Sequence, residues 1–499
     1  MIITIYKKVI ESSFFISFIF VSHIFLWKFV YSKKNTLFET EFTFFQLKFL
    51  LLILLIPAFV KFLIELKNKD YKFIKYFSLF CGFLFLHTGL NLYFDNQQIT
   101  QVVLVKTVLL ILIFIIAYYY YAEIVKNLDL IINIFLILFL LSCFVSFFDY
   151  QKDSPYFCGG VPDIFGLTNK IHGIDPDTPA YANLLENKIA VGNYVKISFR
   201  EFIFLENSHL GMIAPGVLAY TIFRLFKNFN KFNLITTLLF FIICLFKSST
   251  TLLMGFPIIL IGIILFNFKQ IPKKVIMIYL IISAGCIYTL TTSYECKNRF
   301  NPIYGATNFF DNKNYPDMDL THDPSPTLKA GSLSSAVTFS SLRIAKESLL
   351  NKPFGWGANR YIDAYFHYNN IDFMDKFNIS FNKSNYNLDK LNELLPNDRH
   401  TNRLIKVKLL NSSDASNNIV KIIVEFGVFG IFIFLILFLY AIKKSIPIEH
   451  KLFFIPFIGT QMLRGAGYFN SGFLLIALLI IFSYLEKSTF VKNKNLNHV

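Results

Sequence analysis

Residues 102–122 read VVLVKTVLLILIFIIAYYYYA, an apolar run that contains one charged residue, Lys106. A helix of this length crosses about 30 Å, the thickness of the hydrocarbon core of a bilayer. Eleven further windows of the same character occur along the chain, so the sequence predicts an all-α polytopic membrane protein with about twelve transmembrane helices. The twelve windows are 13–31, 46–66, 73–94, 102–122, 130–148, 209–226, 232–247, 249–267, 274–292, 419–442, 451–466 and 470–486.

The composition supports the same fold class. Of the 499 residues, 55% are hydrophobic and 18% aromatic, and the mean hydropathy is +0.52, which excludes a soluble domain of ordinary make-up. The net charge of +16 does not indicate a nucleic-acid partner, because the lysines gather in short connections and form no basic stripe interleaved with exposed aromatics.

The distribution of lysine predicts which side each connection faces. Lysines concentrate in the connections at 67–72, 227–231, 269–274 and 443–444 and in the C-terminal tail. Among the short connections, only the one with Lys33 and Lys34 has lysines on the opposite side when crossings alternate. Under the positive-inside rule these connections and both termini face the cytoplasm, and two long connections lie outside. The chain then divides into N-terminal transmembrane helices as scaffold (1–148), a first outer loop (149–208), central transmembrane helices (209–292), a large outer loop (293–418), and C-terminal transmembrane helices with a cytoplasmic tail (419–499).

The arginines follow a different rule from the forty lysines. Seven of the eight fall on the predicted outer side, whereas Arg224 alone lies on the lysine-rich side. The planar guanidinium grips phosphate or carboxylate through two parallel hydrogen bonds, which an ammonium group cannot do. We therefore expect an anionic substrate that is handled outside the cytoplasm. The seven are Arg200, Arg299, Arg343, Arg360, Arg399, Arg403 and Arg464.

The end of the first outer loop carries the densest polar chemistry. Arg200, Glu206 and His209 stand where the chain re-enters the membrane. If this segment is helical, Glu206 and His209 lie one turn apart on the same face. Either could act as a general base, and a structural hydrogen bond at the helix start is an equal alternative for His209.

The second outer loop is long enough to fold as a small helical cap. Apolar residues recur at helical spacing over 340–351, where Pro353 ends the run, and again over 359–377. The second helix places Tyr361, Ala364, Tyr365, Tyr368 and Phe373 on one stripe, which is expected to cap the membrane face or to pack on it. For each aromatic residue, a helical core position is the default interpretation.

Six cysteines divide between the membrane and the loops. Cys158 and Cys296 lie one in each outer loop, where they could form a disulfide or remain two unrelated thiols. The others, Cys81, Cys143, Cys244 and Cys286, lie within predicted spans.

The sharpest local pattern is at the junction between the large loop and the next span. Ser416 and Asn417 are followed by nine residues and then by GVFG at 427–430, where the small residues permit close helix packing. Asn417 and its neighbour Asn418 stand where a polar substrate would meet the membrane surface. Lys421 and Glu425, four residues apart, are expected to form an ion pair that eases their burial.

These segments resemble the O-antigen polymerase and O-antigen ligase superfamily, integral membrane glycosyltransferases that use lipid-pyrophosphate-linked sugars. The likeness covers residues 200–486. It consists of the entry segment 207–211, the break KSSTT at 247–251, Arg343 followed by NKPFGWG at 351–357, and the junction 416–430.

The resemblance favours the polymerase branch. The family's ligases have a histidine where this chain has Ser416, and serine at its ordinary pKa does not replace imidazole as a general base. The family's polymerases are noted for an arginine and a glycine separated by ten residues in the outer loops. Arg200 and Gly211 fit that spacing, whereas Arg343 and Gly355 are one residue further apart.

The resemblance implies an enzyme that transfers a growing glycan from polyprenyl pyrophosphate to a lipid-linked repeat unit at the periplasmic face of the bacterial inner membrane. The glycan would be O-antigen, and so part of lipopolysaccharide, or a related surface polysaccharide. The expected partners are the polyprenyl-pyrophosphate-linked oligosaccharide, the lipid bilayer and a protein that regulates chain length. Neither a cofactor nor a metal is expected.

Eight residues form the predicted site. Arg343 and Arg200 are the first choices for pyrophosphate contacts, and Arg464 is third because it stands in the final outer turn beside Tyr468. A lipid-headgroup contact is the alternative role for each arginine. The predicted catalytic residues are Arg343, Arg200, Glu206 and His209, and the predicted substrate-binding residues are Arg464, Asn417, Tyr468 and Arg360.

Three other functions stay open. An O-antigen ligase would transfer glycan to the lipid A core. A transporter or flippase of lipid-linked sugars is the main non-enzyme alternative. Proton-coupled transporters usually have acidic residues near the bilayer midplane, whereas Glu65, Glu425 and Glu486 lie near the ends of spans. A structural assembly protein would not need the arginine asymmetry.

Overall fold

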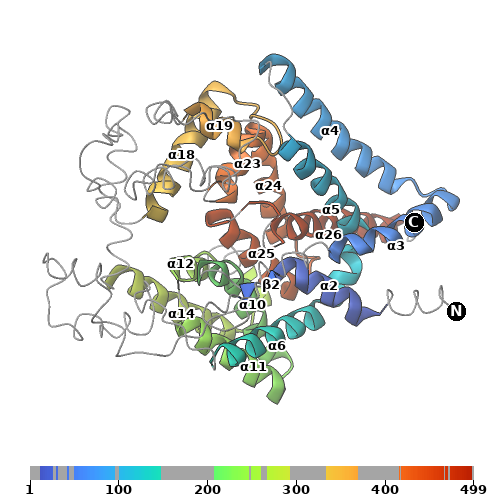
Figure 1. Cartoon of the computed structure of the whole chain (residues 1–499). Coiled ribbons are helices and arrows are strands. Elements are labelled where there is room, and N and C mark those ends of the chain that lie inside the picture. The colour runs from blue at the N-terminus through green and yellow to red at the C-terminus, as the bar shows by residue number, and fades with distance from the viewer. Residues whose placement is uncertain are drawn as a thin grey trace, which may run out of the picture.

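The chain is predominantly helical in the computed structural model (Figure 1). Residues 12–25, 30–31, 42–43, 50–95, 101–147, 207–246, 249–259, 267–292, 333–368, 415, 417–465, 467–469 and 472–496 are described. Over these residues there are fifteen α-helices and one short antiparallel strand pair, in which β1 (Val30–Tyr31) faces β2 (Phe42–Thr43).

Each of the twelve apolar windows overlaps at least one described helix. The helices are α2 (Ser13–Phe25), α3 (Leu55–Lys67), α4 (Lys72–Asp95), α5 (Gln101–Lys126), α6 (Leu128–Phe147), α10 (Asn207–Lys227), α11 (Lys231–Phe246), α12 (Thr250–Ile259), α14 (Lys273–Thr292), α18 (Leu333–Asn351), α19 (Tyr361–Tyr368), α23 (Asn418–Phe426), α24 (Val428–Ile442), α25 (Ile448–Leu463) and α26 (Phe473–Leu496), with a 3-10 turn η3 (Phe268–Gln270) before α14.

Four of the described helices are long and apolar enough to cross a membrane. Their spans are Lys72–Asn91, Val103–Lys126, His209–Lys227 and Lys273–Thr292, and five shorter apolar helices accompany them. These helices support a membrane protein, whereas the number of crossings and the sides of the loops stay predictions. Most of the α10 span is buried and only a small part of the α4 span is, so α10 is a central helix and α4 a peripheral one.

The main core is built around the contact between α10 and α25. The two helices run antiparallel, because Lys227 pairs with Glu449 near one end while Gly216 lies against Phe453 and Phe457 midway. A Cβ atom at Gly216 would stand 2.8 Å from the carbonyl oxygen of Phe453, so only glycine permits this approach. Around this pair, α12 packs on both helices, α11 packs on α10, and α26 packs on α5 (Figure 1).

A second, smaller core joins α18, α19 and α23 (Figure 1). Helix α18 ends at Asn351, as the sequence predicts, but begins at Leu333, before the predicted start. Helix α19 covers the described part of the second predicted helix. Tyr361, Ala364 and Tyr365 are buried in the small core and Tyr368 packs against it, which confirms the predicted core stripe, while Phe373 lies outside the described residues.

The window predicted as one span at 419–442 is divided into two helices, α23 and α24, at Gly427. Its φ of 55° and ψ of −132° place Gly427 in a conformation that L side chains rarely adopt. A Cβ atom here would collide with the carbonyl oxygen of Pro353, which accepts a hydrogen bond from Val428 N at 2.8 Å. The helix is interrupted because the turn after α18 inserts at this point.

Candidate functional site

The four segments that carry the family resemblance meet in two pairs. In the first pair, the start of α10 contacts the start of α12, since a Cβ atom on Gly211 would collide with Ser249 Oγ and stand 2.9 Å from Leu252 N. In the second pair, the turn 353–357 lies on the end of α23. Trp356 N donates to Val424 O and Gly357 N donates to Glu425 O, both at 2.9 Å.

The C-terminal end of α25 connects the two pairs. Thr460 lies against Gly255 of α12, where a Cβ atom would be 3.1 Å from the threonine Oγ1. Gly465, two residues past the end of α25, abuts the side chain of Asn418 so closely that a Cβ atom would collide with Nδ2. All four segments therefore gather around one end of α25, and we treat this region as the candidate site.

The centre of the second pair is a fully buried charge pair. Lys421 and Glu425 are both 0% exposed, and Lys421 Nζ lies 3.8 Å from Glu425 Oε1, which confirms the predicted ion pair. The same carboxylate accepts hydrogen bonds from Asn359 N at 3.0 Å and Tyr361 N at 3.2 Å. Lys421 Nζ also lies 4.9 Å from the ring centre of Tyr468.

These contacts attach the loop 353–361 to α23, which lies outside the four candidate spans. The sequence indicated the i, i+4 pair but carried no signal for the amide donors, which come from a loop distant along the chain.

The two neighbouring asparagines at the junction have different roles. Asn417 is the N-cap of α23, and its Oδ1 accepts a hydrogen bond from Val420 N at 2.8 Å. Asn418 is 0% exposed, and neither atom of its side-chain amide has a hydrogen-bond partner among the described residues. Because buried polar groups are nearly always paired, the Asn418 amide is the stronger candidate for a ligand contact.

Four other polar residues near the end of α25 and the start of α12 are also buried. Gln461 and Thr460 of α25, Thr251 of α12 and Ser249 just before α12 are all buried. Two of them already have protein partners, because Thr460 Oγ1 donates to Pro456 O at 2.7 Å and Ser249 Oγ accepts a hydrogen bond from Leu252 N at 3.4 Å.

The described arginines of the predicted site differ in solvent exposure. Arg343, in α18, is partly exposed and donates from Nη2 to Tyr368 O at 3.2 Å. Arg360 is only 2% exposed, and its Nε is 2.7 Å from the Asp363 carboxylate, so its charge is balanced within the protein. Arg464 is partly exposed and follows the last turn of α25, directly before Gly465.

The remaining predicted residues divide between described and undescribed segments. Tyr468 is buried next to Lys421. His209 is partly exposed in the first turn of α10. Because α10 and α25 run antiparallel, this start of α10 lies toward the C-terminal end of α25. Arg200 and Glu206 lie outside the described residues, as do Cys158 and Cys296. The predicted proximity of Glu206 to His209 thus stays a prediction.

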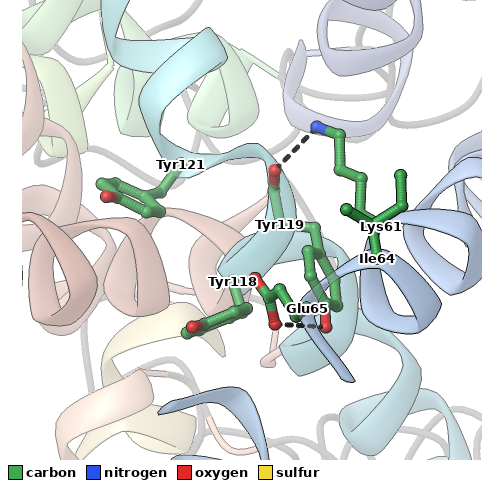
Figure 2. A pocket seen from close by; sticks show the side chains of 6 residues that line it. All are labelled: Lys61, Ile64, Glu65, Tyr118, Tyr119 and Tyr121. Carbon is green, nitrogen blue, oxygen red and sulfur yellow. Dashed lines mark hydrogen bonds between the residues drawn. The ribbon is translucent and has the colours of Figure 1, made fainter. Parts of the chain in front are cut away.

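A cavity of about 350 Å³ lies elsewhere, between α3 and α5 (Figure 2). Its charged groups already have protein partners, because Lys61 Nζ is 2.7 Å from Glu123 and Tyr119 OH donates to Glu65 at 3.0 Å. It includes none of the predicted site residues. The lining residues are Lys61, Ile64, Glu65, Tyr118, Tyr119 and Tyr121.

Comparisons of the chain with protein-family models, with curated proteins and with solved structures gave no match. The structure by itself defines a helical protein with membrane-spanning character and a buried polar region at one end of its central helices.

Proposed function

We propose that this chain is a polysaccharide polymerase. It transfers a growing surface glycan, O-antigen or a related polymer, from polyprenyl pyrophosphate to a lipid-linked repeat unit at the periplasmic face of the inner membrane. The observation that supports this function is the convergence of the four superfamily-like segments around the C-terminal end of α25.

The proposed reaction is a displacement at an activated sugar. The terminal hydroxyl oxygen of the acceptor forms a bond to the anomeric carbon of the donor glycan, the bond from that carbon to pyrophosphate breaks, and the hydroxyl proton passes to a base. The bonding electron pair leaves with the polyprenyl pyrophosphate, which gains one negative charge and spreads it over its phosphate oxygens. Catalysis therefore needs cations beside the leaving group, a base beside the acceptor and a surface that positions both chains.

The described residues suit these tasks to different degrees. Arg343 and Arg464 are partly exposed and can offer a fork to pyrophosphate, and the His209 imidazole can accept the proton. The buried Asn418 amide can bind a sugar hydroxyl or a phosphate oxygen. Arg360, being bound to Asp363, orders the start of α19 and is not proposed to touch the substrate.

The decisive test uses purified protein in liposomes with a synthetic polyprenyl-pyrophosphate repeat unit as the only glycan. The proposal expects a ladder of products that differ by one repeat. Two other outcomes would replace it. A single transfer to added lipid A core would identify a ligase, and movement of the lipid-linked sugar without bond formation would identify a flippase.

The role of Arg343 is tested by Arg343→Lys, which keeps the charge and removes the fork. Polymer synthesis should fall about tenfold to a hundredfold, equivalent to about 1.4–2.7 kcal/mol of lost transition-state stabilisation. Lys346→Gln is the matched control, because Lys346 is an exposed cation on the same helix. Unchanged synthesis by Arg343→Lys at normal protein level would remove Arg343 from the mechanism.

A further inference from the structure

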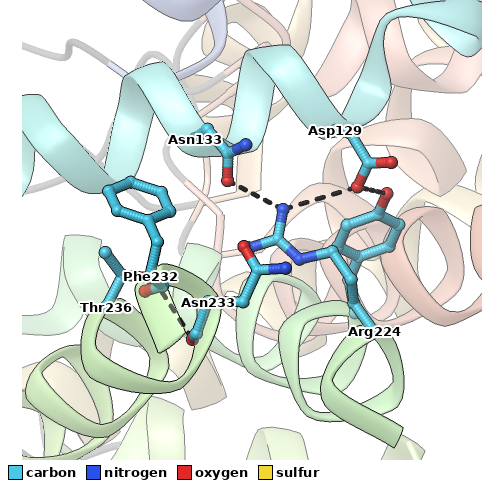
Figure 3. Close-up of polar contacts among 7 residues, drawn as sticks. Asp129, Asn133, Arg224, Phe232, Asn233 and Thr236 are labelled. Atoms are coloured by element: carbon cyan, nitrogen blue, oxygen red, sulfur yellow. Dashed lines mark hydrogen bonds and ion pairs between the residues drawn. The ribbon is translucent and has the colours of Figure 1, made fainter. Parts of the chain in front are cut away.

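A second arginine site lies at the opposite end of α10 from the candidate site. Arg224 is in the last turn of α10, and it is the only arginine on the side that lysine otherwise dominates. Its side chain is directed into a corner formed by the start of α6, the end of α10 and the start of α11 (Figure 3). Although it is a charged residue, Arg224 is only 8% exposed.

Only one part of its guanidinium is occupied by protein groups. Arg224 Nη1 donates to Asn133 Oδ1 at 2.7 Å and lies 3.4 Å from Asp129 Oδ1 (Figure 3). Asp129 is a weak partner, because its side chain is 66% exposed and its Oδ1 also accepts a hydrogen bond from Tyr220 OH. Arg224 Nε and Nη2 are buried and have no hydrogen-bond partner among the described residues.

The two unpaired nitrogens form one edge of the guanidinium. The N–H groups on Nε and Nη2 are parallel, and this edge is the fork that grips the two oxygens of a phosphate or carboxylate. A lysine at this position could pair with Asp129 or Asn133 but could not present such an edge. The unpaired edge gives a physical reason for arginine where the neighbouring connections use lysine.

The start of α11 adds further donors to the corner. Asn233 of α11 lies beside the guanidinium (Figure 3). The first amides of a helix have no partner within the helix and carry partial positive charge, which favours an anion. Asn230 Oδ1 accepts from Phe232 N at 3.0 Å and so satisfies one of these amides.

The surroundings of the corner resemble a membrane interface. Phe226 and Phe229 are exposed, the latter by 71%, and exposed Lys227 and Lys231 stand on either side of Phe229 along the chain. Aromatic and basic residues of this kind gather at the level of lipid headgroups.

We propose that Arg224, together with the first turn of α11, binds a phosphate oxyanion through its Nε–Nη2 edge. The phosphate belongs to a lipid headgroup of the adjacent leaflet or to free phosphate. This site is separate from the polymerase site and does not depend on that function.

The test uses the full chain in dodecyl maltoside micelles, which contain no phosphate. Either inorganic phosphate or phosphatidylglycerol is titrated, and thermal unfolding is followed. A Tm that rises with only one of the two identifies the source, and a Tm that rises with both identifies a site that accepts either.

Three variants make the result specific. Arg224→Lys should lower the affinity for the ligand that raises the Tm about tenfold. Asp129→Asn should raise that affinity several-fold, because a competing carboxylate charge is removed while the side chain keeps its shape. Lys269→Gln, which removes an exposed cation in η3, should bind as the wild type does.

Three results would overturn the proposal. The first is a wild-type Tm that responds to neither ligand, and the second is equal binding by wild type and Arg224→Lys. The third is weaker binding by Asp129→Asn, which would mean that Arg224 is only a structural ion-pair partner.

Discussion

A buried charge pair and a buried arginine in this protein have different surroundings. Glu425 and Lys421 are both 0% exposed, and the carboxylate also accepts two backbone amides from the loop that follows α18. Arg224 is almost as deeply buried, but its carboxylate partner is mostly exposed and one edge of its guanidinium has no partner among the described residues.

This difference in hydrogen bonding distinguishes buried charges that hold the fold together from buried groups that can bind a ligand. A buried charge whose hydrogen bonds are all made holds elements together, and removing one member leaves the other charge uncompensated. A buried donor that remains unpaired destabilises the folded chain, and a ligand that accepts its hydrogen bond removes this destabilisation. The Glu425 pair belongs to the first type, and Arg224 and the Asn418 amide belong to the second.

The largest expected effect comes from Glu425→Ala. The substitution leaves Lys421 charged and buried and leaves the amides of Asn359 and Tyr361 without acceptors, so the free energy of unfolding should fall by about 3–5 kcal/mol. Chemical denaturation in mild detergent measures the loss. The double variant Glu425→Ala/Lys421→Met should recover part of it. An unchanged midpoint for Glu425→Ala would show that the pair does not hold the loop.

A somewhat smaller loss is expected for Gly427→Ala. The added Cβ collides with Pro353 O in a backbone conformation that disfavours side chains, which should cost about 3 kcal/mol. Gly82→Ala in α4 is the matched control, because nothing lies within 4 Å of its Cβ position. If the two variants unfold at the same temperature, the inserted turn is not what divides α23 from α24.

The neighbouring asparagines should separate stability from activity. Asn417→Ala removes the cap of α23 and should cost about 1 kcal/mol, with glycan synthesis retained once the protein level is matched. Asn418→Ala should reduce synthesis more than tenfold with little change in Tm, since its amide bonds no described residue. Parallel Tm and product measurements on both variants test this contrast, and the reverse pattern would exchange the two roles.

The local patterns predicted local structure well. The apolar windows located the helices, Pro353 marked the end of α18, and the spacing of Lys421 and Glu425 predicted their pairing. The sequence also contains the cap signal at Asn417, since asparagine before an apolar helix is a common N-cap, whereas the substrate contact predicted for this residue rests on its position alone.

Long-range contacts could not be predicted in the same way. The helix break at Gly427 depends on Pro353, which is distant along the chain, and an apolar run shows no sign of it. The internal pairing of Arg360 with Asp363 and the unpaired state of the Asn418 amide likewise depend on packing between helices. Arg200 and Glu206 lie outside the described residues, so their part in the site stays a prediction.

The most direct test of the account is the side of the membrane on which α18 lies. Leu350, exposed at the end of α18, is changed to Cys in a chain that lacks Cys158 and Cys296, and intact spheroplasts are treated with a membrane-impermeant thiol reagent. Phe229→Cys is the control for the inner side, because exposed Phe229 follows the C-terminal end of α10, opposite the end of that helix at the candidate site. The account predicts that Leu350→Cys is labelled in intact spheroplasts and Phe229→Cys only after lysis. Labelling of Leu350→Cys only after lysis would place the candidate site inside the cell and contradict the proposed polymerase.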